Sequence, residues 1–194
     1  MPAPRAPRSR ADAVRNRDAV LDAAEALFAD GGPDGVSMSA VAAAAGVGKG
    51  TVFRAFADRT GLLRALAERR GAPLREAVGD GPAPLGPGTP ARERVPAVLD
   101  ALLRFKLDNQ GLHLALEEAG AASPYESESY AWWHATLATS LSELTTKPRA
   151  AYLAHTLLAA VRADLIAHLA TTEHMSPDTL SRRLGEYARS VLPG

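Results

Sequence analysis

The chain has 194 residues, enough for one large domain or two small ones; 46% are hydrophobic, as in ordinary globular proteins, and 22 basic and 22 acidic side chains leave a formal net charge of zero. The absence of cysteine excludes disulfides, thiolate metal sites and cysteine nucleophiles, and is compatible with a cytoplasmic location. No run reaches the roughly 18 apolar residues that a membrane helix needs, and the N-terminal MPAPRAPRSR lacks the apolar core of a signal peptide.

The first predicted helix spans about residues 12–30. Its apolar residues recur at helical spacing and form one face, made of Val20, Leu21, Ala24, Leu27 and Phe28. Gly31-Gly32-Pro33 follows directly. This tripeptide predicts the end of the helix, because glycine readily leaves the helical conformation and proline cannot continue it.

Two short helices joined by a glycine turn are predicted next, over residues 37–45 and about 49–56. Gly46 stands where the first helix must end, since glycine takes the left-handed conformation at little cost. Ala42 is small enough to let the helices approach, while Val52 and Phe56 lie one helical turn apart and are expected to face inward. This is the spacing of a helix-turn-helix, in which the second helix offers its outward face to the DNA major groove.

A longer helix is predicted to start at about residue 59, after the capping residue Asp58. Its buried face is expected to hold Leu62, Leu63 and Leu66. Gly71 and Pro73 predict that this helix stops or kinks there. The segment Gly79–Pro90, GDGPAPLGPGTP, is dense in glycine and proline and is therefore predicted to be a loop.

Five further helices are predicted in the rest of the chain, over about residues 91–108, 110–119, 126–146, 148–172 and from 177 onward. Thr89 is expected to cap the first of them, Pro148 to lie in the first turn of the fourth, and Ser176 to cap the last. No convincing strand is present. The predicted fold class is therefore all-α, with about nine helices: a three-helix head, a connecting helix and a helical body.

Residues 46–66, GVGKGTVFRAFADRTGLLRAL, resemble the DNA-binding signature of the TetR family of transcriptional regulators. The preceding RNRDAVLDAAEALFADGG resembles the first helix of that family, and the two together cover about residues 10–70. The resemblance implies a helix-turn-helix DNA-binding domain over residues 1–58 and a helical ligand-binding and dimerisation domain over residues 59–194. It implies a cytoplasmic, ligand-responsive regulator of the repressor type that binds a palindromic operator in double-stranded DNA as a homodimer.

The same resemblance assigns DNA contacts residue by residue. Thr51 and Arg54 are expected on the exposed face of the second motif helix, here called the recognition helix, near base edges and phosphates. Lys49, at its N-terminus, is expected to meet a phosphate or a guanine edge. Ser37 would donate to a phosphate, and Arg59 would hold the DNA backbone after the recognition helix. The alternative is that these are solvated polar residues on an ordinary helical surface.

Phe53 occupies a position that is most often tyrosine in the family, so a phosphate hydrogen bond is lost and only ring contact remains. The N-terminal arm carries five arginines against the single acidic residue Asp12, a local charge of +4: Arg5, Arg8, Arg10, Arg15 and Arg17. The arm is expected to follow the minor groove or the DNA backbone, and a plain disordered basic tail explains it equally well.

In this family the small-molecule pocket lies in the helical body, where aromatic and leucine side chains suit a small apolar or aromatic effector. Core packing alone explains the same pattern. The candidate ligand-binding residues are Phe105, Leu112, Leu116, Tyr130, Trp133 and Leu137.

The last two predicted helices are expected to form a symmetric four-helix dimer interface, unless the subunit's own core uses both apolar stripes. The candidate interface residues are Leu158, Val161, Leu165, Leu184, Tyr187 and Val191.

No motif points to catalysis, a metal or a cofactor. The GVGKGT segment fails as a phosphate-binding loop, because Gly50 rather than a hydroxyl residue follows Lys49 and no strand precedes it. His113 and Glu117 lie one helical turn apart and could share a metal, although a hydrogen bond explains their spacing as well. We therefore expect no enzyme, cofactor, metal site or membrane partner. Two other functions stay open: a DNA-binding regulator without an effector, and a helical enzyme or carrier on the same fold.

Overall fold

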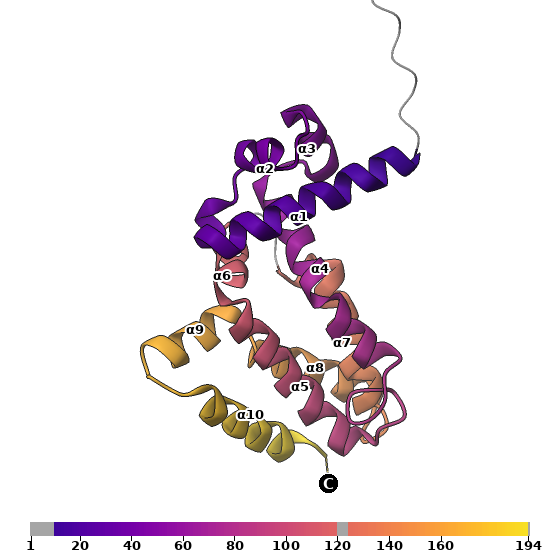
Figure 1. The fold of residues 1–194 in the computed structure, drawn as a ribbon. Coiled ribbons are helices and arrows are strands. Elements are labelled where there is room, and N and C mark those ends of the chain that lie inside the picture. Colours follow the sequence, from indigo (N-terminus) through magenta and orange to yellow (C-terminus); the bar gives the residue numbers. More distant parts are fainter. Residues whose placement is uncertain (1–9, 120–123, 194) are drawn as a thin grey trace, which may run out of the picture. The chain divides into compact units, whose positions relative to one another are not determined.

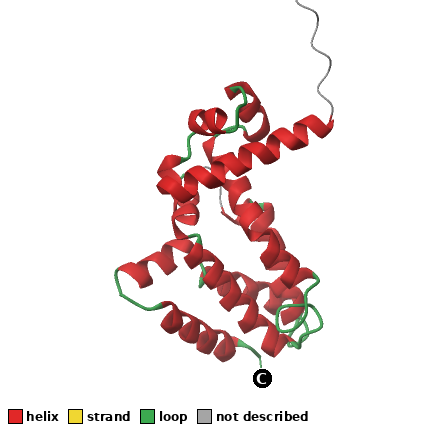
Figure 2. Ribbon diagram, viewed as in Figure 1, coloured by secondary structure: helices red, strands yellow, loops and turns green. Residues whose placement is uncertain are grey.

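The computed structural model describes residues 10–119 and 124–193. The expected arm residues Arg5 and Arg8 lie outside these ranges. Within the described ranges the fold is all-helical, as predicted, with ten α-helices, one short 3-10 helix and no strand (Figures 1 and 2). By length and composition, no single helix of the described residues qualifies as a membrane span; the helices Lys147–Ala159 and Ala163–Thr171 qualify only jointly, with a 42° bend between them.

The chain divides into two compact units, residues 1–69 and 70–194. The first contains α1 (Arg10–Gly35), α2 (Met38–Ala44), α3 (Lys49–Phe56) and the start of α4 (Arg59–Gly79). The second contains the rest of α4 and the remaining elements: α5 (Ala91–Asp108), α6 (Gln110–Glu118), the 3-10 helix η1 (Pro124–Glu126), α7 (Glu128–Leu141), α8 (Lys147–Ala159), α9 (Ala163–Thr171) and α10 (Pro177–Val191).

The first unit, called the head below, has a small apolar core between α1, α2 and α3, which contact one another pairwise. The predicted face of α1 supplies Val20, Leu21 and Ala24, all buried, and the start of α4 adds its three predicted leucines, Leu62, Leu63 and Leu66. Each such leucine, fully removed from water, stabilises the fold by about 1.5–3 kcal/mol. The predicted head core is therefore confirmed, except that Leu27 and Phe28 are only half-buried.

The second unit, called the body, is built around α5, which packs against α7, α9 and α10. Apolar residues of α5 are buried against α10 and α7, and α7 packs along α8. The shared core contains Val95, Val98, Leu99, Leu102, Leu137, Leu141, Ala154, Leu157, Leu180 and Leu184. The amphipathic helices of the body thus bury one another's apolar faces.

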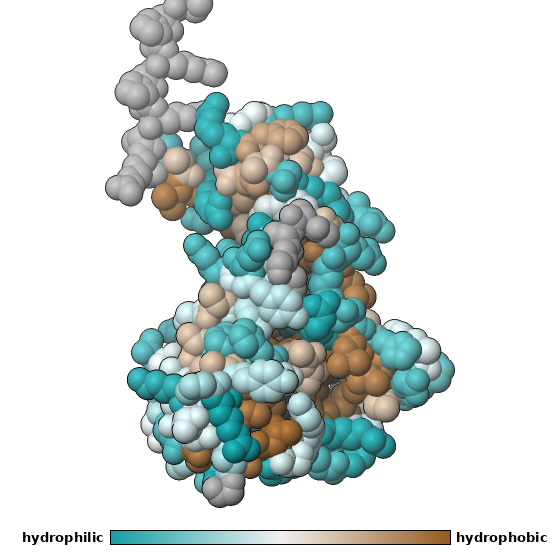
Figure 3. All heavy atoms as spheres, turned by 180° about the vertical axis from the view of Figure 1, so that it is seen from behind, coloured by the Kyte–Doolittle hydropathy of each residue, from teal (hydrophilic) through white to brown (hydrophobic). Residues whose placement is uncertain are grey.

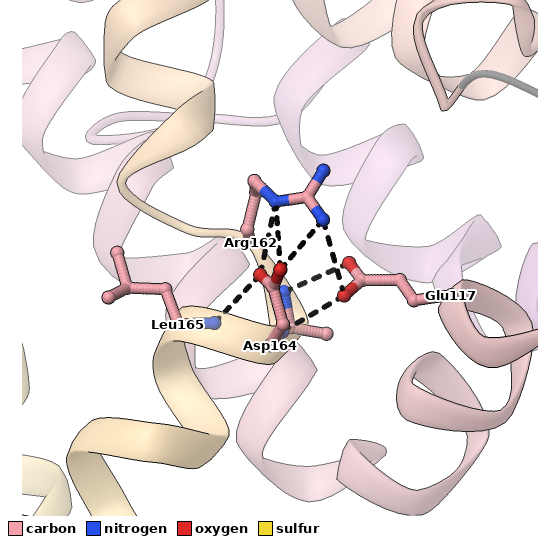
Figure 4. Close-up of polar contacts among 5 residues, drawn as sticks. Glu117, Arg162, Asp164 and Leu165 are labelled. Atoms are coloured by element: carbon pink, nitrogen blue, oxygen red, sulfur yellow. Dashed lines mark hydrogen bonds and ion pairs between the residues drawn. The ribbon is translucent and has the colours of Figure 1, made fainter.

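The helix predicted over residues 148–172 is in fact two helices, α8 and α9, so the expected count of about nine was one too few. The break spans residues 160–162, and Arg162 is the extended N-cap of α9, with φ −65° and ψ 143°. The Glu117 carboxylate of α6 accepts hydrogen bonds from the backbone N–H groups of Ala163 at 3.2 Å and Asp164 at 3.0 Å (Figure 4). A side chain distant in the sequence accepts from the first backbone N–H groups of α9, so no local sequence signal marks the break.

Two expected helix ends also differ. The structure carries α4 through Pro73 to Gly79 as one helix, and α7 ends at Leu141 rather than near residue 146. In α1 the predicted break is present, since Gly32 has non-helical angles of φ 61° and ψ −159°, although helix resumes up to Gly35.

The predicted helix caps are mostly confirmed. Asp58 Oδ1 accepts from Gly61 N at 2.7 Å, and Ser176 Oγ accepts from Thr179 N at 3.2 Å. Thr89 was the wrong cap for α5: Pro90 occupies the N-cap position, and the buried Thr89 hydroxyl has no hydrogen-bond partner among the described residues.

Candidate nucleic-acid interface

The turn between α2 and α3 has the geometry expected of a helix-turn-helix. Gly46 has a positive φ of 64°, which favours glycine over residues with a side chain. Gly46 N donates to Ala43 O at 3.2 Å and Val47 N to Ala42 O at 3.0 Å, which closes the end of α2. Gly48 is then the extended N-cap from which α3 starts.

The inward side of the motif is packed into the head. Ala42, Val52 and Phe56 are 3%, 0% and 6% exposed, as their spacing predicts. Ser37 is the N-cap of α2, and its Oγ accepts from Ala40 N at 3.1 Å, so this exposed hydroxyl already has a structural role. Because the buried side of α3 is fixed, its outward side is held at a fixed orientation within the head.

The outward side of α3 presents two cations and an aromatic ring. Lys49 and Arg54 are exposed, and no hydrogen bond or ion pair joins either to another described residue. Phe53 is 48% exposed, which is unusual for a phenylalanine, and Thr51 is half-buried. The positive end of the α3 dipole adds to the charge of Lys49. Within eight residues, α3 thus offers donors for phosphates and base edges and an apolar surface for sugars or thymine methyl groups.

Two arginines that the sequence predicts as DNA contacts donate hydrogen bonds to main-chain carbonyls within the head. Arg59 Nε donates to Val36 O at 2.8 Å and its Nη2 to Pro33 O at 2.5 Å. Arg17 Nη1 donates to Ala55 O at 3.1 Å, and its guanidinium lies 4.5 Å from the centre of the Phe56 ring. Sequence reasoning missed both contacts, because nothing in the local pattern indicates them.

The corner between α3 and α4 is unusually close. A Cβ added at Gly61 would lie 2.0 Å from the Phe56 carbonyl oxygen, so only glycine fits there without a backbone shift. The first turn of α4 is thereby held against the end of the recognition helix.

Comparisons with known proteins agree with this geometry. The family model described as "Bacterial regulatory proteins, tetR family" matches residues 20–66, from the middle of α1 into α4. A curated HTH-type transcriptional regulator of Staphylococcus aureus is 31% identical over 108 residues, which cover 56% of this chain and 57% of that protein. The HTH-type transcriptional repressor LfrR of Mycolicibacterium smegmatis is 51% identical over 53 residues, 27% of each chain.

The chain is therefore similar to the TetR family over its helix-turn-helix head. Its matches span just over half of one curated relative and about a quarter of the other. A solved TetR-family regulator from Pectobacterium atrosepticum has a TM-score of 0.68 and 21% identity, covering 95% of this chain and 96% of that one. At this identity the likeness shows that the fold is shared, from the helix-turn-helix head through the helical body.

The predicted effector residues come from α5, α6 and α7. Leu112 and Leu137 are buried and the other four are half-buried. Leu137 belongs to the body core, and Tyr130 and Trp133 pack against that core. A shallow hollow in the body is lined by none of the six; its lining residues are Ala159, Arg162, Asp164, Leu165 and His168. Effector binding by the six residues therefore stays a prediction.

Tyr130 also belongs to a ring cluster between α7 and α8 that sequence reasoning missed. Its hydroxyl lies 2.6 Å from His155 Nδ1, and the His134 and His155 rings are 4.0 Å apart. His134 Nε2 donates a hydrogen bond to Ala151 O at 3.0 Å. Desolvation and the neighbouring His134 lower the pKa of His155, and this favours the form in which Tyr130 donates. The hydroxyl of this predicted ligand residue thus already has an internal partner.

His113 of α6 should make stability fall in mild acid. Burial and the charge of Lys106 lower the pKa of His113 from 6.5 to about 4. Between these pH values the unfolded chain binds a proton that the native protein does not, so stability falls as pH drops from about 6.5 to about 4. Because the ring is only partly buried, we expect about 1–2 kcal/mol over this window.

Urea denaturation at pH 7, 5.5 and 4.5 measures this effect. The His113→Gln protein is expected to lose correspondingly less stability across the series than the wild type. His174→Asn, at an exposed position with positive φ that asparagine tolerates, is the matched control and should follow the wild type. If the free energy of unfolding falls by the same amount with pH in the wild type and in His113→Gln, the prediction is wrong.

The predicted dimer residues divide into two groups. Leu158, Val161 and Leu184 are buried in the core of the subunit, and Val191 packs against that core. Only Leu165 and Tyr187, each 39% exposed, present substantial surface. The face drawn in Figure 3 is largely hydrophilic with separate hydrophobic areas. Tyr152 of α8, which the sequence stripe did not include, is 69% exposed.

Proposed function

We propose that this protein is a homodimeric TetR-family repressor that binds a palindromic operator through α3, and that a small apolar or aromatic effector lowers its affinity for that operator. The observation that carries the proposal is the α3 surface: exposed Lys49, Phe53 and Arg54 on a helix whose opposite side, Val52 and Phe56, is locked into the head core. The similarity to LfrR, a transcriptional repressor that is 51% identical over 53 residues, supports the repressor role.

Operator reading needs two heads, because one recognition helix contacts only one half-site. Two-fold symmetry would place two copies of α3 in successive major grooves, about 34 Å apart along the DNA. Lys49 and Arg54 would neutralise phosphates or meet guanine edges, and Phe53 would contact the sugar or a thymine methyl group. Because the proposed target is operator DNA, we propose that the protein is cytoplasmic.

Effector control is proposed to act through α4, the helix that begins in the head and continues into the body. Effector binding would shift α4 and change the separation of the two heads, so that both recognition helices no longer dock together. The coupling is reciprocal, and operator DNA should weaken effector binding by the same factor. A body that only dimerises is the second candidate, favoured by the packing of Leu137, Tyr130 and Trp133. Thermal-shift screening with apolar compounds separates the two.

The direct experiment is a gel shift with DNA from the gene's own promoter, followed by titration of single-base variants of the bound site. Thr51→Ala is expected to relax discrimination at one position of each half-site by about 1–3 kcal/mol, since this residue faces base edges in the proposed complex. Absence of any specific complex with the wild-type protein would refute the DNA-binding proposal. An unchanged base preference in the variant would refute only the role of Thr51.

The dimer is proposed to form through the exposed apolar residues of α8, α9 and α10, namely Tyr152, Leu165 and Tyr187. These side chains gain most from being covered by a second copy, whereas the buried leucines of the stripe are already covered. Tyr152→Glu combined with Tyr187→Glu is expected to raise the dimer dissociation constant about tenfold or more, because charges would be desolvated at the interface.

Light scattering after size exclusion, over a dilution series, measures the dimer dissociation constant. Val14→Glu, at a 56% exposed position on α1 in the head, is the control and should leave self-association unchanged. A glutamate double variant that dimerises like the wild type would place the interface elsewhere.

A further inference from the structure

Arg59 is the first residue of α4, and its half-buried side chain donates hydrogen bonds to the main chain of the head. Nε and Nη2 donate to the carbonyl oxygens of Val36 and Pro33 at 2.8 and 2.5 Å. These carbonyls lie where the chain leaves α1 and enters α2. Pro33 O also accepts from Val36 N at 3.2 Å, and a cation is favoured beside the carbonyls at the end of a helix, so the guanidinium fits this place.

The segment that accepts hydrogen bonds from Arg59 leads directly into the helix-turn-helix. Val36 is fully buried and directly precedes Ser37, the N-cap of α2. Its carbonyl therefore lies at the entry to the helix-turn-helix. On the other side, Arg59 follows the recognition helix after only Ala57 and Asp58, and Ala57 has a positive φ of 64°. One side chain thus joins the segment just before the motif to the segment just after it.

We propose that Arg59 is a positioning residue that fixes the orientation of the helix-turn-helix, and is not a phosphate ligand. This inference rests on the proposed DNA-binding function. The guanidinium presents two donors in one plane, which two neighbouring carbonyls can accept together. A lysine ammonium has the same charge but a single nitrogen, so it cannot reproduce this fork. A phosphate contact, in contrast, depends chiefly on the charge.

Two measurements on the full-length protein test the proposal, with Arg59→Ala and Arg59→Lys as variants. Arg64→Ala is the matched control, because it removes the same charge from an exposed position on the same helix. The first measurement is hydrogen exchange of peptides covering residues 33–45, without DNA. Both Arg59 variants are expected to exchange about tenfold faster there than the wild type or Arg64→Ala. An unchanged exchange rate in Arg59→Lys overturns the proposal. The Arg59→Lys variant therefore decides the test even if Arg59→Ala fails to fold.

The second measurement is operator affinity as a function of salt. Both Arg59 variants are expected to bind about tenfold more weakly, with the slope of log affinity against log salt unchanged. A lost phosphate contact would instead reduce that slope by about one in Arg59→Ala, with affinity restored by lysine, and this result overturns the proposal. If the wild type binds no promoter DNA, the proposed function fails, while the exchange data still decide whether Arg59 holds the motif.

Discussion

An Arg94→Ala protein is expected to be about 3 kcal/mol less stable than the wild type, the largest stability loss that we predict for a single substitution. Arg94 is only 6% exposed. Its guanidinium donates to three neutral acceptors, Leu85 O at 2.9 Å, Ser140 Oγ at 2.8 Å and Val78 O at 2.8 Å. Alanine would leave all three acceptors without this donor and would open a cavity between α5 and α7.

The location of these acceptors makes Arg94 a link between three parts of the body. Val78 lies in the last turn of α4, where carbonyls lack helical donors, and Leu85 lies in the following loop. Loss of Arg94 is therefore expected to loosen the C-terminal end of α4, the helix proposed to carry the effector signal.

Thermal and urea denaturation measure the Arg94 effect, which corresponds to a fall in melting temperature of about 6–12 °C for a chain of this size. Arg94→Lys keeps the charge but offers one nitrogen for three acceptors in different directions, so it should recover little of the loss. Arg92→Ala, at an exposed position two residues earlier on α5, is the control. A variant within about 0.5 kcal/mol of the wild type would show that water or rearrangement replaces the three hydrogen bonds.

Removal of both exposed cations of α3, in Lys49→Ala combined with Arg54→Ala, is expected to reduce operator affinity about 100-fold or more. Each contact to a phosphate or a base edge contributes about 1–3 kcal/mol. The two losses should be nearly additive unless the side chains share one phosphate. Because neither side chain bonds another described residue, the stability of the head should not change.

Fluorescence anisotropy with labelled operator at one fixed salt concentration measures this loss. Lys147→Ala combined with Arg149→Ala removes the same charge from exposed positions on α8 and serves as the control. A loss of less than about threefold would show that the two cations of α3 contribute little to operator binding. An equal loss in the control would show that affinity depends on the net charge of the protein and not on the surface of α3.

The sequence predicted much of the candidate interface because its signals are local. Gly46 marks the turn by its conformational freedom, and the spacing of Val52 and Phe56 identifies the buried side of α3. Arg54 is then exposed as predicted, and Lys49 and Phe53 are exposed beside it, whereas Thr51, expected on the same face, is half-buried. Their contact with DNA stays a prediction.

The roles of arginines could not be predicted in the same way. Arg17 and Arg59 resemble free cations in the sequence, yet their acceptors, Ala55 O and Val36 O, lie 38 and 23 residues away along the chain. The pattern around Arg94 predicts only that this residue is helical, and its acceptor Ser140 lies on α7, 46 residues away along the chain. A long flexible side chain can reach several neighbours, so its partner is known only once the fold brings those neighbours together.

By itself the sequence determined the helical class, the helix-turn-helix, most caps and the apolar stripes, since each is a property of a few adjacent residues. Only the tertiary structure decided that Leu158, Val161 and Leu184 face the core of their own subunit, leaving Tyr152 and Tyr187 exposed. It alone showed that α8 and α9 are separate helices, because the Glu117 carboxylate that stabilises the break comes from α6. Helical periodicity shows that a face must be covered, whereas the element that covers it is chosen by packing between distant segments.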